Sequence, residues 1–358
     1  MNDLTVALAI VGGVALAGVL AHGAWQARRA GPRRAEPAPA QVAREQQQVE
    51  PVLTDAGAVP AVGTHGPDGP DLTLPRSPPR RNAARLDALI DAIATLRPET
   101  PELPFAGASV LAHLPATRRV GSKPLAIEGL DAASGEWEPI SADATYSALQ
   151  AGVLLANRTG ALNEIEYSEF VQRVQTLADA VGAMPDCPDM LDVVARAREL
   201  DAFASAHDAQ LALHLQARGA AWSPGYLQQQ AARHGFVPGA VPGRLVLASP
   251  DEGAPPVLVL SFDAQAALAD EPERAAVRDV TLSFDVAQTE ATREPFAAWQ
   301  STATALAADI DGVLVDDNGR PFGVEAFASI GSELERLYGA LAGRDLAAGS
   351  PAARRLFS

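Results

Sequence analysis

The densest group of polar side chains in the sequence is the run Asp316-Asp317-Asn318-Gly319. Two neighbouring carboxylates are suited to acid–base chemistry or to holding a cation. However, the calcium-loop spacing D-x-[DN]-x-[DN]-G is absent, and the run lies between the segments VLV and RPF. Asn-Gly in this position is typical of a type I′ hairpin turn, which requires positive φ at both central residues. We therefore predict a turn, and we keep a hydrolase that uses Asp316 and Asp317 as the opposing hypothesis.

The other side chains capable of chemistry stand apart from one another. The histidines beyond the first hundred residues fall outside the metal-binding spacings HxxxH and HExxH, and they are His113, His207, His214 and His234. Cys187 is the only cysteine, which excludes an internal disulfide and any multi-cysteine zinc or iron–sulfur site. Lys123 is the only lysine and has no P-loop around it, and the motifs G-x-G-x-x-G and G-x-S-x-G are absent. We therefore expect no enzymatic activity, no metal and no cofactor.

Composition narrows the partners as well. The chain has 358 residues and a formal net charge of −16. Such an acidic chain is a poor nucleic-acid binder, because neutralising phosphates requires a basic surface. We therefore expect no nucleic-acid partner.

Residues Leu4–Trp25 predict a transmembrane helix. These 22 positions carry no charge, and a helix of that length spans roughly 33 Å, enough to cross the hydrocarbon core of a bilayer. Four arginines follow within ten residues, which predicts a periplasmic N-terminus and a cytoplasmic remainder. The alternative is a cleaved signal peptide, which the absence of basic residues in MNDLT disfavours. We thus divide the start of the chain into an anchor (1–25) and a disordered, Pro- and Gln-rich linker (26–81).

The elements that would position any site lie beyond the linker. Helical spacing of apolar residues predicts a helix over 83–97, and strand-like stretches follow at 108–114, 125–130 and 148–156. Helices are expected over 164–181 and 190–205. A second series then has strands at 210–216, 244–248, 257–262 and 280–286, helices at 223–234, 295–309 and 324–342, and a hairpin at 312–322.

This pattern predicts an α+β fold with antiparallel strands and helices packed on one face of the sheet. In VTLSFDV (280–286), apolar and polar residues alternate, which is typical of a strand with one buried face. The likeness of LADAVGAM (177–184) to LAADIDGVL (306–314) suggests that the two halves are degenerate copies. We therefore expect a subdomain over 82–207, a domain over 208–345 and a flexible tail over 346–358.

The sequence resembles ZipA-type cell-division proteins, which have an N-terminal anchor, a Pro/Gln-rich linker and a C-terminal FtsZ-binding domain. The order of parts matches over the whole chain. The motifs that carry the resemblance are PGYLQQQAARHGFVPG (224–239), LVLASPDEG (245–253), VTLSFDV (280–286) and LAADIDGVLVDDNGRP (306–321). Residues 83–205 have no identified counterpart in the family.

The resemblance implies a split β-α-β domain whose solvent-facing sheet face binds the C-terminal tail of FtsZ, the tubulin-like GTPase of the division ring. The groove positions carried over by alignment are Leu213, Leu215, Val241, Val259, Asp263, Gln265, Ser283 and Arg320. Ser283 and Asp263 fall where the family prefers large apolar residues, and Gln265 falls where it can have lysine, so the implied groove is less apolar and less basic. Leu213 and Leu215 have a second interpretation as core residues.

The resemblance thus implies an adaptor that tethers division-ring filaments to the cytoplasmic face of the inner membrane at the septum. Its partners would be the FtsZ tail, the inner membrane through residues 4–25, and further copies of itself. The alternative is a non-catalytic envelope scaffold that binds another membrane or division protein.

Overall fold

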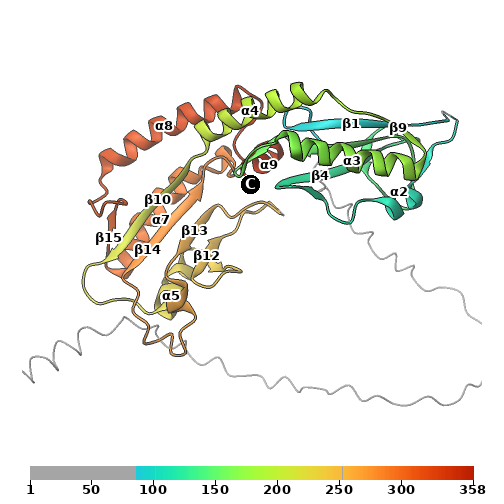
Figure 1. The fold of residues 1–358 in the computed structure, drawn as a ribbon. Helices are drawn as coiled ribbons and strands as arrows, with labels where there is room; N and C mark the ends of the chain where they lie inside the picture. The colour runs from blue at the N-terminus through green and yellow to red at the C-terminus, as the bar shows by residue number, and fades with distance from the viewer. Residues whose placement is uncertain (1–85, 101, 252) are drawn as a thin grey trace, which may run out of the picture. The chain divides into compact units, whose positions relative to one another are not determined.

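The computed structural model describes residues 86–358, apart from 101 and 252. These residues form a mixed α and β structure with two antiparallel sheets, whose strands run from blue to green and from yellow to orange in Figure 1. No helix within the described residues is long and apolar enough to cross a membrane. The predicted anchor over Leu4–Trp25 and the predicted linker over 26–81 lie outside the described residues.

The first sheet has the order β3-β4-β6-β1-β9, with β2 beside β6 and β5 beside β4. Its strands are β1 (Asp91–Pro98), β2 (Phe105–Ala106), β3 (Arg119–Val120), β4 (Lys123–Asp131), β5 (Trp137–Pro139), β6 (Thr145–Leu154) and β9 (Ala183–Asp186). A small hairpin joins β7 (Ala156–Asn157) and β8 (Gly160–Ala161). The helices of this half are α2 (Gly107–His113), α3 (Glu164–Val181) and α4 (Met190–His207).

Helix α3 shows how local sequence sets the bounds of an element. The Asn163 side chain accepts the N–H groups of Ile165 and Glu166, and the Glu166 carboxylate accepts the N–H of Asn163, which is a capping box. At the other end Gly182 takes a left-handed conformation with φ 70°, which glycine adopts without steric cost. The residues that α3 buries recur at helical spacing, and they are Tyr167, Phe170, Val174, Leu177 and Ala178.

The second sheet has the order β11-β12-β13-β14-β10-β15. Its strands are β10 (Gln210–Ala217), β11 (Val237–Pro238), β12 (Arg244–Leu247), β13 (Leu258–Ser261), β14 (Asp279–Asp285) and β15 (Gly312–Val315). Its helical segments are α5 (Pro224–Arg233), α6 (Ala264–Ala267), η1 (Ala291–Arg293), α7 (Pro295–Ile310), α8 (Val324–Ala342) and α9 (Pro351–Leu356).

Two tryptophans connect α7 to this sheet and the loop before α5 to the end of α7. Trp299 of α7 is fully buried and donates its indole N–H to the carbonyl of Leu282 at 2.9 Å. Trp222 is also fully buried and donates to the carbonyl of Ile310 at 2.7 Å. Each polar N–H therefore finds an acceptor inside the core, as a buried indole requires.

The two halves repeat one order of elements. In each half a first long strand precedes a helix (α2 or α5), with the two-residue strand β2 inserted in the first half only, and then come further strands, a long helix (α3 or α7), a short edge strand and another helix (α4 or α8). The sheet orders β4-β6-β1-β9 and β13-β14-β10-β15 match position by position. Gly182 and Asp311 end α3 and α7 alike, in left-handed conformations with φ 70° and 55°. A common origin of the two halves stays a prediction.

Two predicted elements are wrong. The helix expected over 83–97 is strand β1 from Asp91 onward, because pairing with β6 and β9 on both sides outweighs the apparent helical spacing. Its buried residues Ala92, Ala94 and Leu96 alternate with period two instead. The strand expected over 108–114 is helix α2. The helices predicted over 164–181 and 324–342 have the predicted bounds.

The C-terminal residues also differ from the prediction. The flexible tail predicted over 346–358 is wrong, because α9 is ordered, and Leu346, Leu356 and Phe357 are buried in the core of the first half. This core otherwise consists of residues from Ile90 to the end of α4, together with Ala287, Leu341, Ala348 and Ala353. Residues 346–357 therefore pack into the first half, although they follow the second half in the sequence.

Candidate partner-binding face

Alternation along the strands gives the second sheet an inner and an outer face. On the inner face Leu213, Leu215 and Leu282 share one core with buried residues of α5, α7 and α8. The predictions that Leu213 and Leu215 line the groove are wrong, since both side chains are 0% exposed. The strand must turn its leucines toward the helices, because one residue of shift would move every side chain to the other face.

The outer face carries a row of small and apolar side chains across five strands. Register places Ala212 beside Ser283, and Ser283 beside Val259. The row continues through Val246 of β12 to Val237 of β11. Ala212 is exposed, Ser283 is half-buried and Val259 is 9% exposed. The structure thus brings together two of the predicted groove residues, Val259 and Ser283, and adds Ala212, which sequence reasoning missed.

A polar row runs beside this one, through Arg244, Ser261, Thr281 and His214. The His214 ring contacts Asp279 through Nδ1 at 2.8 Å and Asp317 through Nε2 at 3.2 Å. The hydrogen bond with Asp279 is the main cause that raises the pKa of His214 above its ordinary value, against an opposing effect of burial. This end of the outer face therefore offers a histidine held between two carboxylates.

The other predicted groove residues lie at the margins of the sheet. Val241 is 54% exposed in the loop before β12. Asp263 and Gln265 begin α6, where the Asp263 carboxylate caps the N–H of Gln265 at 2.8 Å. The loop that holds Val241 is joined to the end of β13, because the carbonyl of Gly243 accepts the N–H of Phe262 at 2.9 Å. Arg320 lies beyond β15, at the opposite edge of the sheet.

The Asp316–Gly319 run forms a turn, as predicted, but of another type. Only Gly319 of this run has positive φ, at 73°, so the turn is not type I′. The Asp316 carboxylate accepts the N–H groups of Asn318 and Arg320 at 2.9 and 2.8 Å. These bonds, with that from Arg320 first, lower the pKa of Asp316. Asp316 thus holds the turn together, while Asp317 contacts His214.

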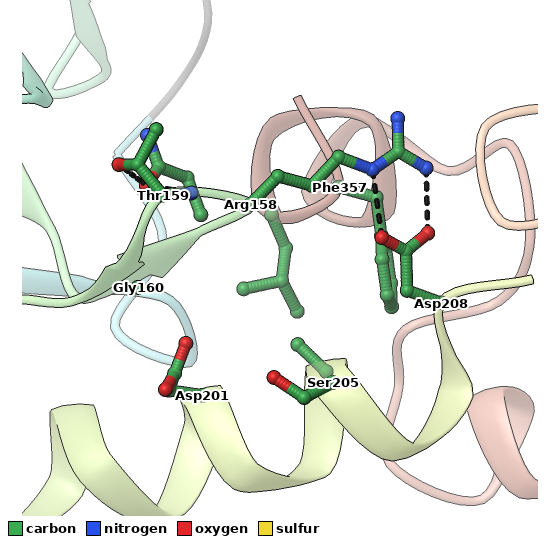
Figure 2. Close-up of a pocket in the computed structure, with 10 residues that line it drawn as sticks. Arg158, Thr159, Gly160, Asp201, Ser205, Asp208 and Phe357 are labelled. Atoms are coloured by element: carbon green, nitrogen blue, oxygen red, sulfur yellow. Dashed lines mark hydrogen bonds and ion pairs between the residues drawn. The ribbon is translucent and has the colours of Figure 1, made fainter.

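A small pocket lies between the β7–β8 hairpin, α4 and the C-terminal residues (Figure 2). Figure 2 shows Asp201 and Ser205 on α4 below the hairpin, and Arg158 reaching to Asp208. The Arg158 guanidinium binds Asp208 through two hydrogen bonds of 2.6 and 2.8 Å and contacts Asp285 at 2.6 Å. Because two carboxylates already engage this cation, the pocket is better explained as a structural junction than as an anion site.

Lys123, the only lysine, is buried next to this pocket. Its Nζ donates to Asn157 Oδ1 at 2.8 Å, to Ser122 Oγ at 2.9 Å and to Thr159 Oγ1 at 3.3 Å. Burial is the main cause that lowers its pKa. All three ammonium protons have acceptors, which is the arrangement expected of a structural buried lysine.

Comparisons with known proteins add little to this geometry. No family model matches the chain, and no curated protein matches it. Among solved structures, berberine bridge enzyme from Eschscholzia californica aligns with 12% identity and a TM-score of 0.15, over 74% of this chain. The chain spans about half the length of that enzyme, 52%. A likeness this weak carries no argument about fold or function.

The alternation that locates the outer face is present in the sequence. In QLALHLQ, Leu211, Leu213 and Leu215 alternate with Ala212 and His214. The same rule, applied to VTLSFDV, correctly separates buried Leu282 and Phe284 from half-buried Ser283. Applied to β10, the same rule assigns Ala212 and His214 to the outer face, in place of Leu213 and Leu215.

Proposed function

We propose that this chain is a membrane-anchored adaptor that binds the C-terminal tail of FtsZ and tethers division-ring filaments to the cytoplasmic face of the inner membrane during septum assembly. In this proposal residues 208–345 form a split β-α-β domain of the ZipA kind, and residues 4–25 form the single-pass anchor with a periplasmic N-terminus. The chain acts without catalysis, as one partner in a protein–protein contact, and self-association is compatible with this role.

The observation that carries the proposal is the outer face of the second sheet. The helices α5, α7 and α8 contribute buried residues to the core on the inner face, and on the outer row Ala212 is exposed and Ser283 is half-buried, so these two positions are accessible to a partner. An extended peptide fits such a face, because pockets between alternate side chains can accept apolar residues. The long attachment to the membrane would raise the local concentration of the domain near the filaments.

A pull-down with the full-length chain tests this proposal. Immobilised protein is incubated with full-length FtsZ and with FtsZ that lacks its C-terminal tail. We expect only the full-length form to be retained. Equal retention of both forms would overturn the tail-binding proposal.

A variant of the outer face sharpens the experiment. Ala212→Arg places a long cation on the exposed row next to Ser283, and we expect it to reduce FtsZ retention at least about tenfold, which corresponds to about 1.4 kcal/mol. Ala328→Arg is the matched control, because Ala328 is exposed on α8, away from the sheet. Loss of retention in both variants alike, or in neither, would place the contact elsewhere on the chain.

A further inference from the structure

The chain itself covers one position on the outer face of the first sheet. Leu86 lies over Gly152 of β6: a Cβ atom at Gly152 would fall 2.3 Å from Leu86 Cδ2. Gly152 points to the outer face, since its neighbours Ala151 and Val153 belong to the core. The absence of a side chain at Gly152 therefore makes the space that the leucine fills.

The backbone of the covering segment is also bound to the sheet. The N–H of Leu86 donates to Glu128 Oε1 at 3.1 Å, and Glu128 Oε2 accepts from Gln150 Nε2 at 2.8 Å. Glu128 lies in the middle of β4 and is only 3% exposed. A buried carboxylate that accepts a backbone N–H from a crossing segment supplies the polar half of a segment-binding site, and Gly152 supplies the apolar half.

The covered position corresponds to the open row of the second sheet. The edge strands β9 and β15 begin directly after the left-handed residues that end α3 and α7. Ala183 of β9 pairs with Pro98, and Gly312 of β15 pairs with Ala217. Five residues before these partners lie Ile93 and Ala212, whose neighbours are Gly152 and Ser283.

Beyond Gly152 lies Ala126, and beyond Ser283 lies Val259. Hence the row Ile93–Gly152–Ala126, with Leu86 over its glycine, occupies the register of the row Ala212–Ser283–Val259. In the first sheet Leu86 covers the glycine of this row, whereas at the same positions of the second sheet Ala212 is exposed and Ser283 is half-buried.

We propose that the outer face of the first sheet is a second segment-binding face, which accepts a leucine-bearing peptide segment and which residues Leu86–Ile90 hold closed in cis. The segment is fixed after Leu86 by a turn in which the N–H of Asp91 donates to the carbonyl of Asp87 at 2.8 Å. Arg196 of α4 also binds the carbonyl of Ala88 at 2.6 Å. The leucine side chain is therefore the part that a competing segment would displace. This inference concerns a face that the FtsZ proposal does not use.

The test uses the full-length chain and a fluorescent peptide with the sequence of residues 82–91, and it measures binding by anisotropy. Every protein also carries Ala212→Arg, so that peptide bound to the second sheet is not counted. We expect the Leu86→Asp variant to bind the peptide at least about tenfold more tightly than the parent, because the vacated site over Gly152 accepts the leucine of the peptide. A peptide with aspartate in place of Leu86 should not bind.

Two controls make the result specific. Leu191→Asp changes a leucine that is 74% exposed at the start of α4, and it should leave binding at the level of the parent. Gly152→Val, added to Leu86→Asp, should abolish binding, since its side chain fills the site. If Leu86→Asp does not fold, Leu86→Ala replaces it with a smaller but measurable gain. Equal binding by variant and parent, absence of binding by both, or binding that survives Gly152→Val would overturn the proposal.

Discussion

At the scale of the residue, His214 joins two separate parts of the outer face. Its ring contacts Asp279 at the start of β14 and Asp317 in the turn after β15. Both contacts favour the protonated ring, which can donate from both nitrogens. The charge of this one side chain thus influences how firmly the turn is attached to the sheet.

The direction of the His214 pKa shift predicts a pH dependence of stability. Because its pKa in the folded chain is raised, the stability that it contributes is fully present below the ordinary histidine pKa and is lost as pH rises through the folded value. We expect His214→Gln to lower the free energy of unfolding by less than about 1 kcal/mol at about pH 5.5, and by less still at about pH 9. Urea denaturation of the variant and the parent at both pH values measures the two losses in the free energy of unfolding.

The control for that experiment is His113→Gln. The His113 ring contacts a main-chain carbonyl, that of Ser109, rather than a carboxylate. A loss of stability for His214→Gln that stays constant or grows between the two pH values would contradict the assignment.

At the scale of the element, bounds fixed by local chemistry are the ones that sequence predicts well. The capping box of Asn163 and Glu166 and the left-handed Gly182 lie within or next to α3 itself, and its predicted bounds are confirmed. Strand β1 is the opposite case: its apolar residues fit helical spacing, and only its partners on both sides decide for a strand. Such partners are distant in sequence and cannot be found from periodicity.

The same distinction applies to the candidate site. The resemblance predicts Val259 and Ser283, which lie side by side, whereas Leu213 and Leu215 face the core. Alternation within QLALHLQ supports the correct assignment, but Leu86 over Gly152 could not be predicted, because it depends on a contact between residues 66 positions apart.

The capping box gives a prediction for α3. Asn163→Ala removes the acceptor for the N–H groups of Ile165 and Glu166, and we expect it to lower the free energy of unfolding by about 1 kcal/mol. Asn163→Ser keeps an acceptor at the N-cap without adding a second carboxylate beside Glu166, and it should stay close to the parent. Chemical denaturation followed by circular dichroism separates the two. An equal loss in both variants would show that the side chain matters for a reason other than capping.

At the scale of the whole molecule, the end of the chain completes the first half. Arg355 of α9 binds Asp91 at the start of β1 through bonds of 2.7 and 2.6 Å, and the Asp91 side chain is fully buried. Leu356 and Phe357 enter the same core. The first half therefore depends on a contact between residues that are 264 positions apart in the sequence.

This ion pair predicts an asymmetric mutational response. Arg355→Met leaves the carboxylate of Asp91 buried without its cation, and we expect a loss of about 3 kcal/mol in the free energy of unfolding. Adding Asp91→Asn removes that buried charge and should recover part of the loss. A double-mutant cycle by urea denaturation measures the coupling. Additive losses would show that the two side chains do not stabilise the fold as a pair.

Lys123 has a practical consequence for studying this protein. It is the only lysine in the chain, and the described structure encloses its amine among Asn157, Ser122 and Thr159. Amine-reactive dyes and cross-linkers would therefore find little in the native protein to attack apart from its α-amino group. Amine modification of Lys123 would instead require local or global unfolding that exposes its amine. The rate of this modification would therefore measure how often the protein unfolds around Lys123.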